Sequence, residues 1–276
     1  MENEPMEDQP IAGSLIEDAW SEGSIYERFM GRWSRLLARD FVTWLDIPAG
    51  GNWLDVGTGT GALVDAVCEH GKPKSILACD PVAAFVDVAR RNITDDRVEF
   101  LQAGVGELPS RDGGFDMVIS NVALNFFNDA TEALREQASL LCAEGMVAAS
   151  VWDYAGDMQF LRHFWDEAKT INPRAAKLDE GVRFSFCNPG ALKELFSGAG
   201  LEKIRIFPIA VPTIFENFDD YWSPFLAGTG PAPSFVASLS EEDRILLADG
   251  LRRRLPVATD GRIDMVARAW VVAGCR

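Results

Sequence analysis

Three glycines at alternate positions, Gly57, Gly59 and Gly61, directly follow a short apolar stretch, residues 52–56. Glycine has no Cβ, so such a loop lets the backbone turn sharply and lets a ligand lie against its amide groups. A second apolar stretch further along the chain ends in Asp80. An acid at the tip of a neighbouring strand suits the two free hydroxyls of a ribose. The glycine loop and the acid together predict a site for an adenosine-containing cofactor.

The same loop, read as Gly57-x-Gly59-x-x-Ala62, also fits the fingerprint of dinucleotide-binding proteins loosely. Asp55 argues against NAD, because a carboxylate at the end of the strand repels a pyrophosphate. It suits instead the amino group of a cofactor, reached through water or backbone. The strict alternation of the glycines also widens the loop beyond what a dinucleotide turn needs. A dehydrogenase therefore stays as an alternative only.

Short apolar runs alternate with amphipathic runs around these residues, which is typical of strands alternating with helices. The alternation predicts an α/β fold with a mostly parallel sheet and helices on both faces. The expected strands are residues 52–56, 75–79, 98–102, 115–120, 145–152, 201–211 and 263–272. Helical spacing is found at residues 25–45, 62–69, 83–92, 129–141, 160–168, 191–199 and 241–254.

The organisation that we expect is one domain over residues 21–276, preceded by a flexible, acidic segment, residues 1–20. Residues 21–47 form a helical cap in this interpretation. Two insertions rich in aromatic residues, 155–186 and 215–260, interrupt the alternation and are interpreted as helical lids that contact the substrate.

Four sequence blocks carry a family resemblance. They are the glycine loop, Asp80 with Pro81, residues 98–109 and residues 114–125, and an upstream element, Tyr26–Ser34, accompanies them. Together they resemble the class I S-adenosylmethionine-dependent methyltransferases, specifically the type 11 group that includes the quinone-biosynthesis C-methyltransferases. The resemblance implies a doubly wound, Rossmann-like sheet of seven strands whose last strand is inserted antiparallel beside the sixth. It also implies S-adenosyl-L-methionine as the cofactor.

One position departs from the family. The family usually has an aspartate that accepts a hydrogen bond from the adenine amino group, and Gly104 stands in its place here. Such a charge-assisted bond is worth about 1.5–3 kcal/mol, so the departure predicts weaker or less selective adenine binding. Backbone groups of Val105 and Gly106 remain as partners for the adenine edge.

Cofactor contacts follow from the loop, from the tip of the fourth strand and, through the resemblance, from the N-terminal cap. Arg32 would pair with the cofactor carboxylate, with a surface charge as the alternative. Trp33 would contact cofactor or acceptor, with simple core packing as the alternative. The full set of predicted cofactor-binding residues is Tyr26, Arg32, Trp33, Asp55, Gly57, Thr58, Gly59, Gly61, Asp80, Pro81, Val82, Gly104, Val105, Gly106, Asn121 and Val122.

The acceptor side is less defined by the sequence. Trp152 and Tyr154 follow the fifth strand and are expected to wall an acceptor pocket. The candidates for a catalytic role are Tyr26, Asn121, Trp152 and His163, and none of them forms a convincing general base with a partner. We therefore expect in-line methyl transfer to a small, apolar or aromatic molecule whose acceptor atom needs no dedicated base. The alternative is a cofactor-binding or regulatory protein of the same fold without transferase activity.

Composition narrows the partners. A formal net charge of −16 repels nucleic-acid phosphates and anionic membranes, and no run is long and apolar enough to span a bilayer. Five scattered cysteines indicate reduced thiols of a cytoplasmic protein. With only two histidines, no metal site is expected.

Overall fold

A computed structural model describes residues 27–227 and 230–276. Its centre is a seven-stranded sheet with the order β3-β2-β1-β4-β5-β7-β6. The strands are β1 (Asn52–Val56), β2 (Ser75–Asp80), β3 (Val98–Gln102), β4 (Phe115–Asn121), β5 (Leu141–Trp152), β6 (Glu202–Phe215) and β7 (Ile263–Cys275).

Strands β1 to β5 are paired in parallel, and β7 is inserted antiparallel between β5 and β6. This confirms the expected mixed sheet with an antiparallel last strand. Two prolines, Pro208 and Pro212, lie within β6. A proline removes a ladder donor, and β6 tolerates two of them because it is an edge strand that pairs with β7 alone.

The helices beside the sheet belong to both halves of the chain. The π-helix η1 (Glu27–Gly31) continues into α2 (Arg32–Leu45), which packs against α3 (Ala62–Ala66) and against β6. Helix α5 (Ala130–Ser139) packs against β5 and against α8 (Pro189–Gly198). The other elements of this layer are η2 (Val67–Gly71), α4 (Ala83–Asn92) and η3 (Leu124–Phe126).

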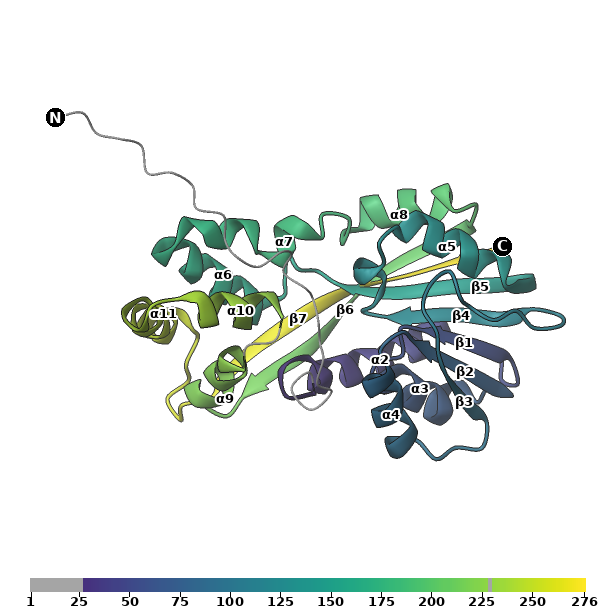
Figure 1. Cartoon of the computed structure of the whole chain (residues 1–276), viewed down its shortest axis with the longest axis horizontal. Coiled ribbons are helices and arrows are strands. Elements are labelled where there is room, and N and C mark those ends of the chain that lie inside the picture. The colour runs from purple at the N-terminus through teal and green to yellow at the C-terminus, as the bar shows by residue number, and fades with distance from the viewer. Residues whose placement is uncertain (1–26, 228–229) are drawn as a thin grey trace.

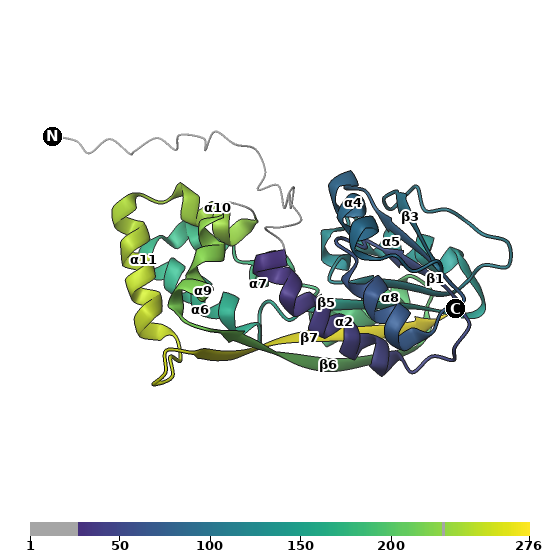
Figure 2. The same ribbon diagram turned by 90° about the horizontal axis from the view of Figure 1, so that it is seen from below.

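Strands β6 and β7 continue beyond the rest of the sheet as a two-stranded ribbon. Residues 269–275 of β7 lie between β5 and β6, whereas β6 is the only one of the named strands that pairs with residues 263–268. The ribbon leads to a second group of helices, seen on the left in Figures 1 and 2, which we call the helical lobe. It comprises α6 (Gln159–Ile171), η4 (Pro173–Lys177), α7 (Glu180–Arg183), α9 (Phe218–Trp222), η5 (Ser223–Leu226), α10 (Pro231–Ser238) and α11 (Glu241–Arg254).

Aromatic side chains form the core of the helical lobe. Phe164 and Phe225 stack with their ring centroids 4.5 Å apart, and the buried Tyr221 hydroxyl donates to the Phe160 carbonyl at 2.9 Å. Phe29 of η1 contacts both Phe160 and Phe225 edge to face. The N-terminal helix therefore joins the sheet to the helical lobe, because η1 packs against η5 of the lobe and α2 packs against β6 of the sheet.

Several of the expected segment ends differ from the observed ones by up to four residues. The helix after the glycine loop changes into the π-helix η2 at Val67, β5 begins at Leu141, and β6 continues to Phe215. The expected flexible segment, residues 1–20, and Tyr26 lie outside the described residues. None of the helices in residues 27–227 and 230–276 has the length and apolar character needed to cross a bilayer.

Candidate functional site

The glycine loop connects β1 to α3. Gly57, Gly59 and Gly61 all have positive φ, at 79°, 54° and 93°, in the region that side chains with a Cβ rarely adopt. A Cβ at Gly57 would lie 2.6 Å from the Cβ of Ala123, but one at Gly59 would have no heavy atom within 4 Å. Gly57 is thus required for packing, whereas the space over Gly59 is open to a ligand.

Asp80 holds this loop from the end of β2. Its Oδ2 accepts a hydrogen bond from the Gly59 amide and its Oδ1 accepts one from the Val82 amide, both at 2.9 Å. Burial raises the pKa of Asp80, and these two amides partly offset the rise. Each oxygen keeps a further lone pair, so the carboxylate is able to accept hydrogen bonds from two neighbouring hydroxyls.

Asp55 lies fully buried at the end of β1. Burial raises its pKa to about 7; the nearby Thr58 hydroxyl lowers it and repulsion from Asp80 raises it further. Neither Asp55 oxygen makes a hydrogen bond of normal geometry within the described part of the chain. A buried carboxyl without a partner is costly, and a ligand that brings a donor or a positive charge removes that cost.

The end of β4 is strained and firmly held. Val122 has a φ of 51°, which is rare for a β-branched residue and typical of functional sites. Its amide donates to the carbonyl and to Oγ of Ser150, each at 3.0 Å. Asn121 accepts from the Ser150 hydroxyl at 2.7 Å and donates to the Ser34 carbonyl at 3.3 Å. Strands β4 and β5 and helix α2 are therefore joined at this point.

These two adjacent residues line two different cavities. The first, the loop cavity, is lined by Ser34, Gly57, Thr58, Gly59, Thr60, Ala62, Leu63 and Asn121. The second, the aromatic cavity, is lined by Phe29, Met30, Val122, Phe126, Trp152, Tyr154, Leu161, Glu180, Phe184 and Pro231. Asn121 lines the first and Val122 lines the second.

Trp152 and Tyr154 line the aromatic cavity, as the sequence predicts for an acceptor wall. His163 does not line it. This residue lies on α6, where burial lowers the pKa of its imidazole and the nearby Arg254 lowers it further. His163 lines neither cavity, and its catalytic role stays a prediction that the geometry does not support.

Arg32 does not stand free to pair with a cofactor carboxylate. Its Nη1 pairs with Asp220 at 3.1 Å, and its guanidinium lies over the rings of Trp33 and Phe215 at 4.4 and 4.7 Å from their centroids. Trp33 is buried and contacts Phe215 edge to face, which is the core packing that was the alternative. Arg32 is thus paired with an acid of the helical lobe that is 188 positions away in the sequence, and Trp33 is packed against the end of β6.

The segment after β3 borders the acidic strand tip. A Cβ at Gly104 would lie 3.4 Å from Pro81. The Gly106 amide, expected at the adenine edge, donates to Glu136 at 2.7 Å instead. Val82 and Val105 expose 38% and 37% of their surface, so each of the segments that follow β2 and β3 presents an apolar side chain to solvent.

Sequence reasoning missed Glu180. It lies in the aromatic cavity wall, is 6% exposed and accepts a hydrogen bond from the buried Trp165 indole. Burial raises its pKa to about 7. The only signal in the sequence is an acidic pair, Asp179-Glu180, beside a glycine within an aromatic insertion. No cluster of three or more His, Cys, Asp or Glu side chains able to hold a metal occurs among the residues that the structure describes.

Comparisons with known proteins agree with this geometry. The family described as "Methyltransferase domain" matches residues 54–149, which include the glycine loop, Asp80 and the end of β4. Malonyl-[acyl-carrier protein] O-methyltransferase of Priestia megaterium is 28% identical over 116 residues, which is 42% of either chain. The 2-phytyl-1,4-naphtoquinone methyltransferase of Thermosynechococcus vestitus is 26% identical over 61% of this chain and 80% of its own. This chain thus spans less than half the length of the first relative.

A solved structure shares the fold. Phosphoethanolamine N-methyltransferase 2 of Haemonchus contortus, in complex with S-adenosyl-L-methionine, superposes with a TM-score of 0.56 at 15% identity, covering 93% of this chain and 56% of its own. The loop geometry fits that cofactor, since the open space over Gly59 and the Asp80 carboxylate suit an adenosine. The buried Asp55 suits its ammonium group. S-adenosylmethionine is therefore the cofactor that these residues would hold.

Proposed function

This chain contains a class I S-adenosylmethionine-dependent methyltransferase domain of the type 11 group, and from it we propose that the protein methylates a small, aromatic or apolar molecule. The observation that carries the proposal is that two adjacent residues line different cavities: Asn121 lines the loop cavity and Val122 lines the aromatic cavity. The glycine loop lines the loop cavity, which suits the methyl donor, and the mostly apolar and aromatic lining of the aromatic cavity suits an acceptor.

On the donor side, we assign the ribose to Asp80 and the amino acid end to Asp55. Val82 and Val105 are exposed apolar side chains on the segments that follow β2 and β3, and we assign the adenine ring to the space between them. The Gly59 amide is already fixed by Asp80, so the loop keeps its shape whether or not a ligand is bound.

The chemistry that the cofactor supplies is an activated methyl group, because its leaving group is a neutral thioether. The residues of this chain have three tasks: to hold the acceptor in line, to exclude water and to fix the distance between the two ligands. The strained Val122, anchored twice by Ser150, sets where the acceptor stops. Trp152 and Phe184 close the aromatic cavity with apolar surface, which favours a reaction whose charge becomes dispersed.

The insertions predicted as lids supply residues to the aromatic cavity and none to the loop cavity. Residues 155–186 supply Leu161, Glu180 and Phe184 to the aromatic cavity, and residues 215–260 supply Pro231. We propose that the helical lobe covers the acceptor. The Arg32–Asp220 pair then holds the cover to helix α2.

Calorimetry with S-adenosylmethionine and S-adenosylhomocysteine tests the cofactor, and release of S-adenosylhomocysteine with a panel of phenols, amines and activated aromatic carbons tests the transfer. We expect micromolar binding that is lost in Asp80→Ala and kept in Glu194→Gln, an exposed acid on α8. No binding by the folded wild type at millimolar ligand would refute the proposal. Binding without turnover on any acceptor class would favour the alternative of a cofactor-binding or regulatory protein without transferase activity. The absence of the usual acid at Gly104 is the observation that supports this alternative.

A further inference from the structure

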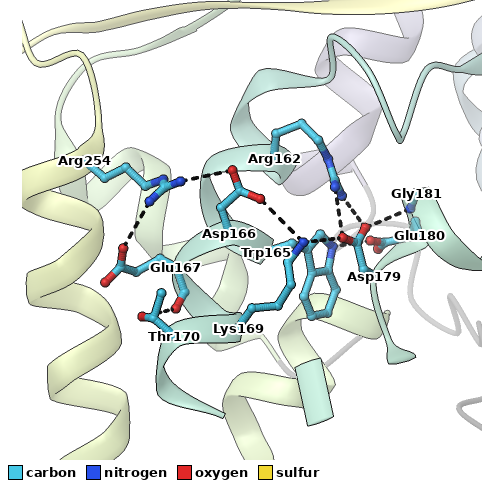
Figure 3. A network of polar contacts seen from close by, with 10 residues as sticks. All are labelled: Arg162, Trp165, Asp166, Glu167, Lys169, Thr170, Asp179, Glu180, Gly181 and Arg254. Atoms are coloured by element: carbon cyan, nitrogen blue, oxygen red, sulfur yellow. Dashed lines mark hydrogen bonds and ion pairs between the residues drawn. The ribbon is translucent and has the colours of Figure 1, made fainter. Parts of the chain in front are cut away.

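Glu180 is fixed in the wall of the aromatic cavity by the way α7 packs. A Cβ on the next residue, Gly181, would lie 2.9 Å from the Ala155 Cα and 3.0 Å from the Tyr154 carbonyl. The absence of that atom lets α7 lie directly on the chain that leaves β5. Glu180 therefore stands beside the residues expected to face the acceptor, and the Trp165 indole N–H holds its carboxyl group (Figure 3).

The negative charge of the neighbouring Asp179 is neutralised by basic side chains, whereas that of Glu180 is not. Asp179 accepts from both Nη atoms of Arg162, from Lys169 at 3.1 Å and from the Gly181 amide at 2.8 Å (Figure 3). Glu180 forms no ion pair among the described residues. The two adjacent acids thus differ in their surroundings. Asp179 holds elements of the lobe together through its hydrogen bonds and ion pairs, whereas Glu180 lines a cavity without a cationic partner.

Resting on the methyl-transfer function proposed above, we propose that Glu180 is the proton acceptor of the reaction. It follows that the acceptor carries a hydroxyl or an amine on an aromatic or apolar body. A single buried carboxylate among aromatic rings fits this class, since the rings bind the body and the carboxylate accepts from the one polar donor.

The step balances without a further reactant. The O–H bond of the acceptor, or an N–H bond of its ammonium form, breaks, and the proton moves to the Glu180 carboxylate, giving a neutral carboxylic acid. The electron pair stays on the acceptor oxygen or nitrogen and forms the new bond to the methyl carbon. The pair of the carbon–sulfur bond stays on sulfur, giving the neutral thioether. The proton on Glu180 returns to solvent when the product leaves.

The charges around Glu180 suit a base that works near neutrality. Burial raises its pKa to about 7; its own backbone amide and the Trp165 indole lower it, Asp179 raises it and Arg162 lowers it slightly. Lys169 and Arg162 of α6 are both engaged by Asp179. Arg183 of α7 and Tyr154 beyond β5 are further polar groups near Glu180 in the sequence, and both have partners. The remaining titratable groups on the packed elements are His163, Asp166 and Glu167 of α6 and Arg174 and Lys177 of η4. Asp179 and Glu180 have pKa values pushed in opposite directions, which is the pattern of a division between structural and proton-transfer roles.

The same charge gives specificity. A carboxylate acceptor would bring a second negative charge into an apolar cavity, where repulsion is strong. We therefore expect discrimination against acids of the same shape, and a preference for phenols and amines.

The test uses the full chain saturated with S-adenosylhomocysteine and four probes of one shape: phenol, benzylamine, toluene and benzoate. Glu180→Gln keeps the size of the side chain and an acceptor for Trp165 but removes the charge. At pH 8 this substitution should raise the dissociation constant of benzylamine at least 10-fold and that of phenol at least 5-fold. It should change the dissociation constant of toluene less than 2-fold and lower that of benzoate. Glu194→Gln, an exposed acid on α8, is the control and should leave all four unchanged.

A second measurement reads the proton directly. In protein labelled with ¹³C at the glutamate carboxyl carbon, the resonance missing from Glu180→Gln should titrate between pH 6 and 8. Trp165→Phe, which keeps a ring but removes the donor to the charged form, should move that titration to higher pH. Equal probe affinities in wild type and Glu180→Gln, no probe binding at all, or a titration near pH 4.5 would each overturn the proposal. Cofactor calorimetry separates the two proposals: intact binding with any of these outcomes removes only the role of Glu180.

Discussion

Replacing Gly104 with aspartate is expected to tighten cofactor binding, because the position stands where related proteins accept from the adenine amino group. The structure has room for the change. A Cβ at Gly104 would lie 3.4 Å from Pro81, an ordinary contact, and Gly104 is not among the glycines with positive φ. The backbone therefore accepts a side chain there without strain.

The magnitude follows from two opposing effects. A hydrogen bond to a carboxylate contributes about 1.5–3 kcal/mol. Glu107 is near, with its Oε2 3.5 Å from the Gly104 amide, and repulsion between exposed like charges costs about 0.2–1 kcal/mol. The net gain is about 0.5–2.8 kcal/mol, which is about a 2- to 100-fold tighter dissociation constant.

Calorimetry of wild type and Gly104→Asp with S-adenosylhomocysteine measures the gain. S-inosylhomocysteine, whose purine lacks the amino group, is the matched ligand and should show no gain. Gly106→Asp is the matched variant, because its φ of 92° makes any side chain strained and its amide is already engaged by Glu136. Unchanged or weaker affinity of a folded Gly104→Asp for S-adenosylhomocysteine would show that the adenine does not lie beside this residue.

Three further predictions concern the glycine loop and its acids. Asp80→Asn should weaken S-adenosylmethionine binding about 10- to 100-fold by removing a charge-assisted acceptor, measured by calorimetry; an unchanged constant would remove the ribose assignment. Gly57→Ala should lower the free energy of unfolding by about 1–3 kcal/mol, since its Cβ meets Ala123 at 2.6 Å. Gly59→Ala should lower it by only about 1–2 kcal/mol but abolish cofactor binding, and thermal unfolding with calorimetry distinguishes the two glycines. The folded-state pKa of Asp55, about 7, lies above its ordinary 3.8, so the unfolded chain loses this proton first as pH rises. Stability of the free protein should therefore fall between about pH 4 and 7, and Asp55→Asn should flatten that fall; an equally steep decline in the variant would contradict the assignment.

The parallel core was predictable because its signals are local. The five residues of β1, the turn at Gly57 and the helix Ala83–Asn92 are each specified by neighbours in the sequence, and their bounds agree with the structure. The start of β5 was not predictable. The register between β4 and β5 shifts near Phe115, and a Cβ at Gly145 would lie 2.9 Å from the Phe115 carbonyl. The irregularity depends on a contact between two strands and leaves no periodic pattern in either.

The same distinction explains the site. The glycine loop and Asp80 lie at the tips of two strands, so the order of the strands alone brings them together. Arg32 and Glu180 depend on how the helical lobe packs. Arg32 pairs with Asp220 because β6 carries that acid back beside α2. Glu180 reaches the aromatic cavity because Gly181 allows close packing. Neither contact has a counterpart in sequence spacing.

Two buried carboxyl groups, Asp55 and Glu180, are expected to gain a partner when the ligands bind. Asp55 and Glu180 each have a pKa near 7 and no cationic partner among the described residues. Holding them charged costs stability in the absence of ligands. A cofactor that carries positive charge relieves Asp55, and an acceptor that donates a proton relieves Glu180. Because groups that bind only the folded state stabilise it, the rise in melting temperature on cofactor binding should grow between pH 6 and 8 in the wild type. In Asp55→Asn it should be nearly constant, and a constant rise in both proteins would show that this carboxyl group is not where the cofactor charge is met.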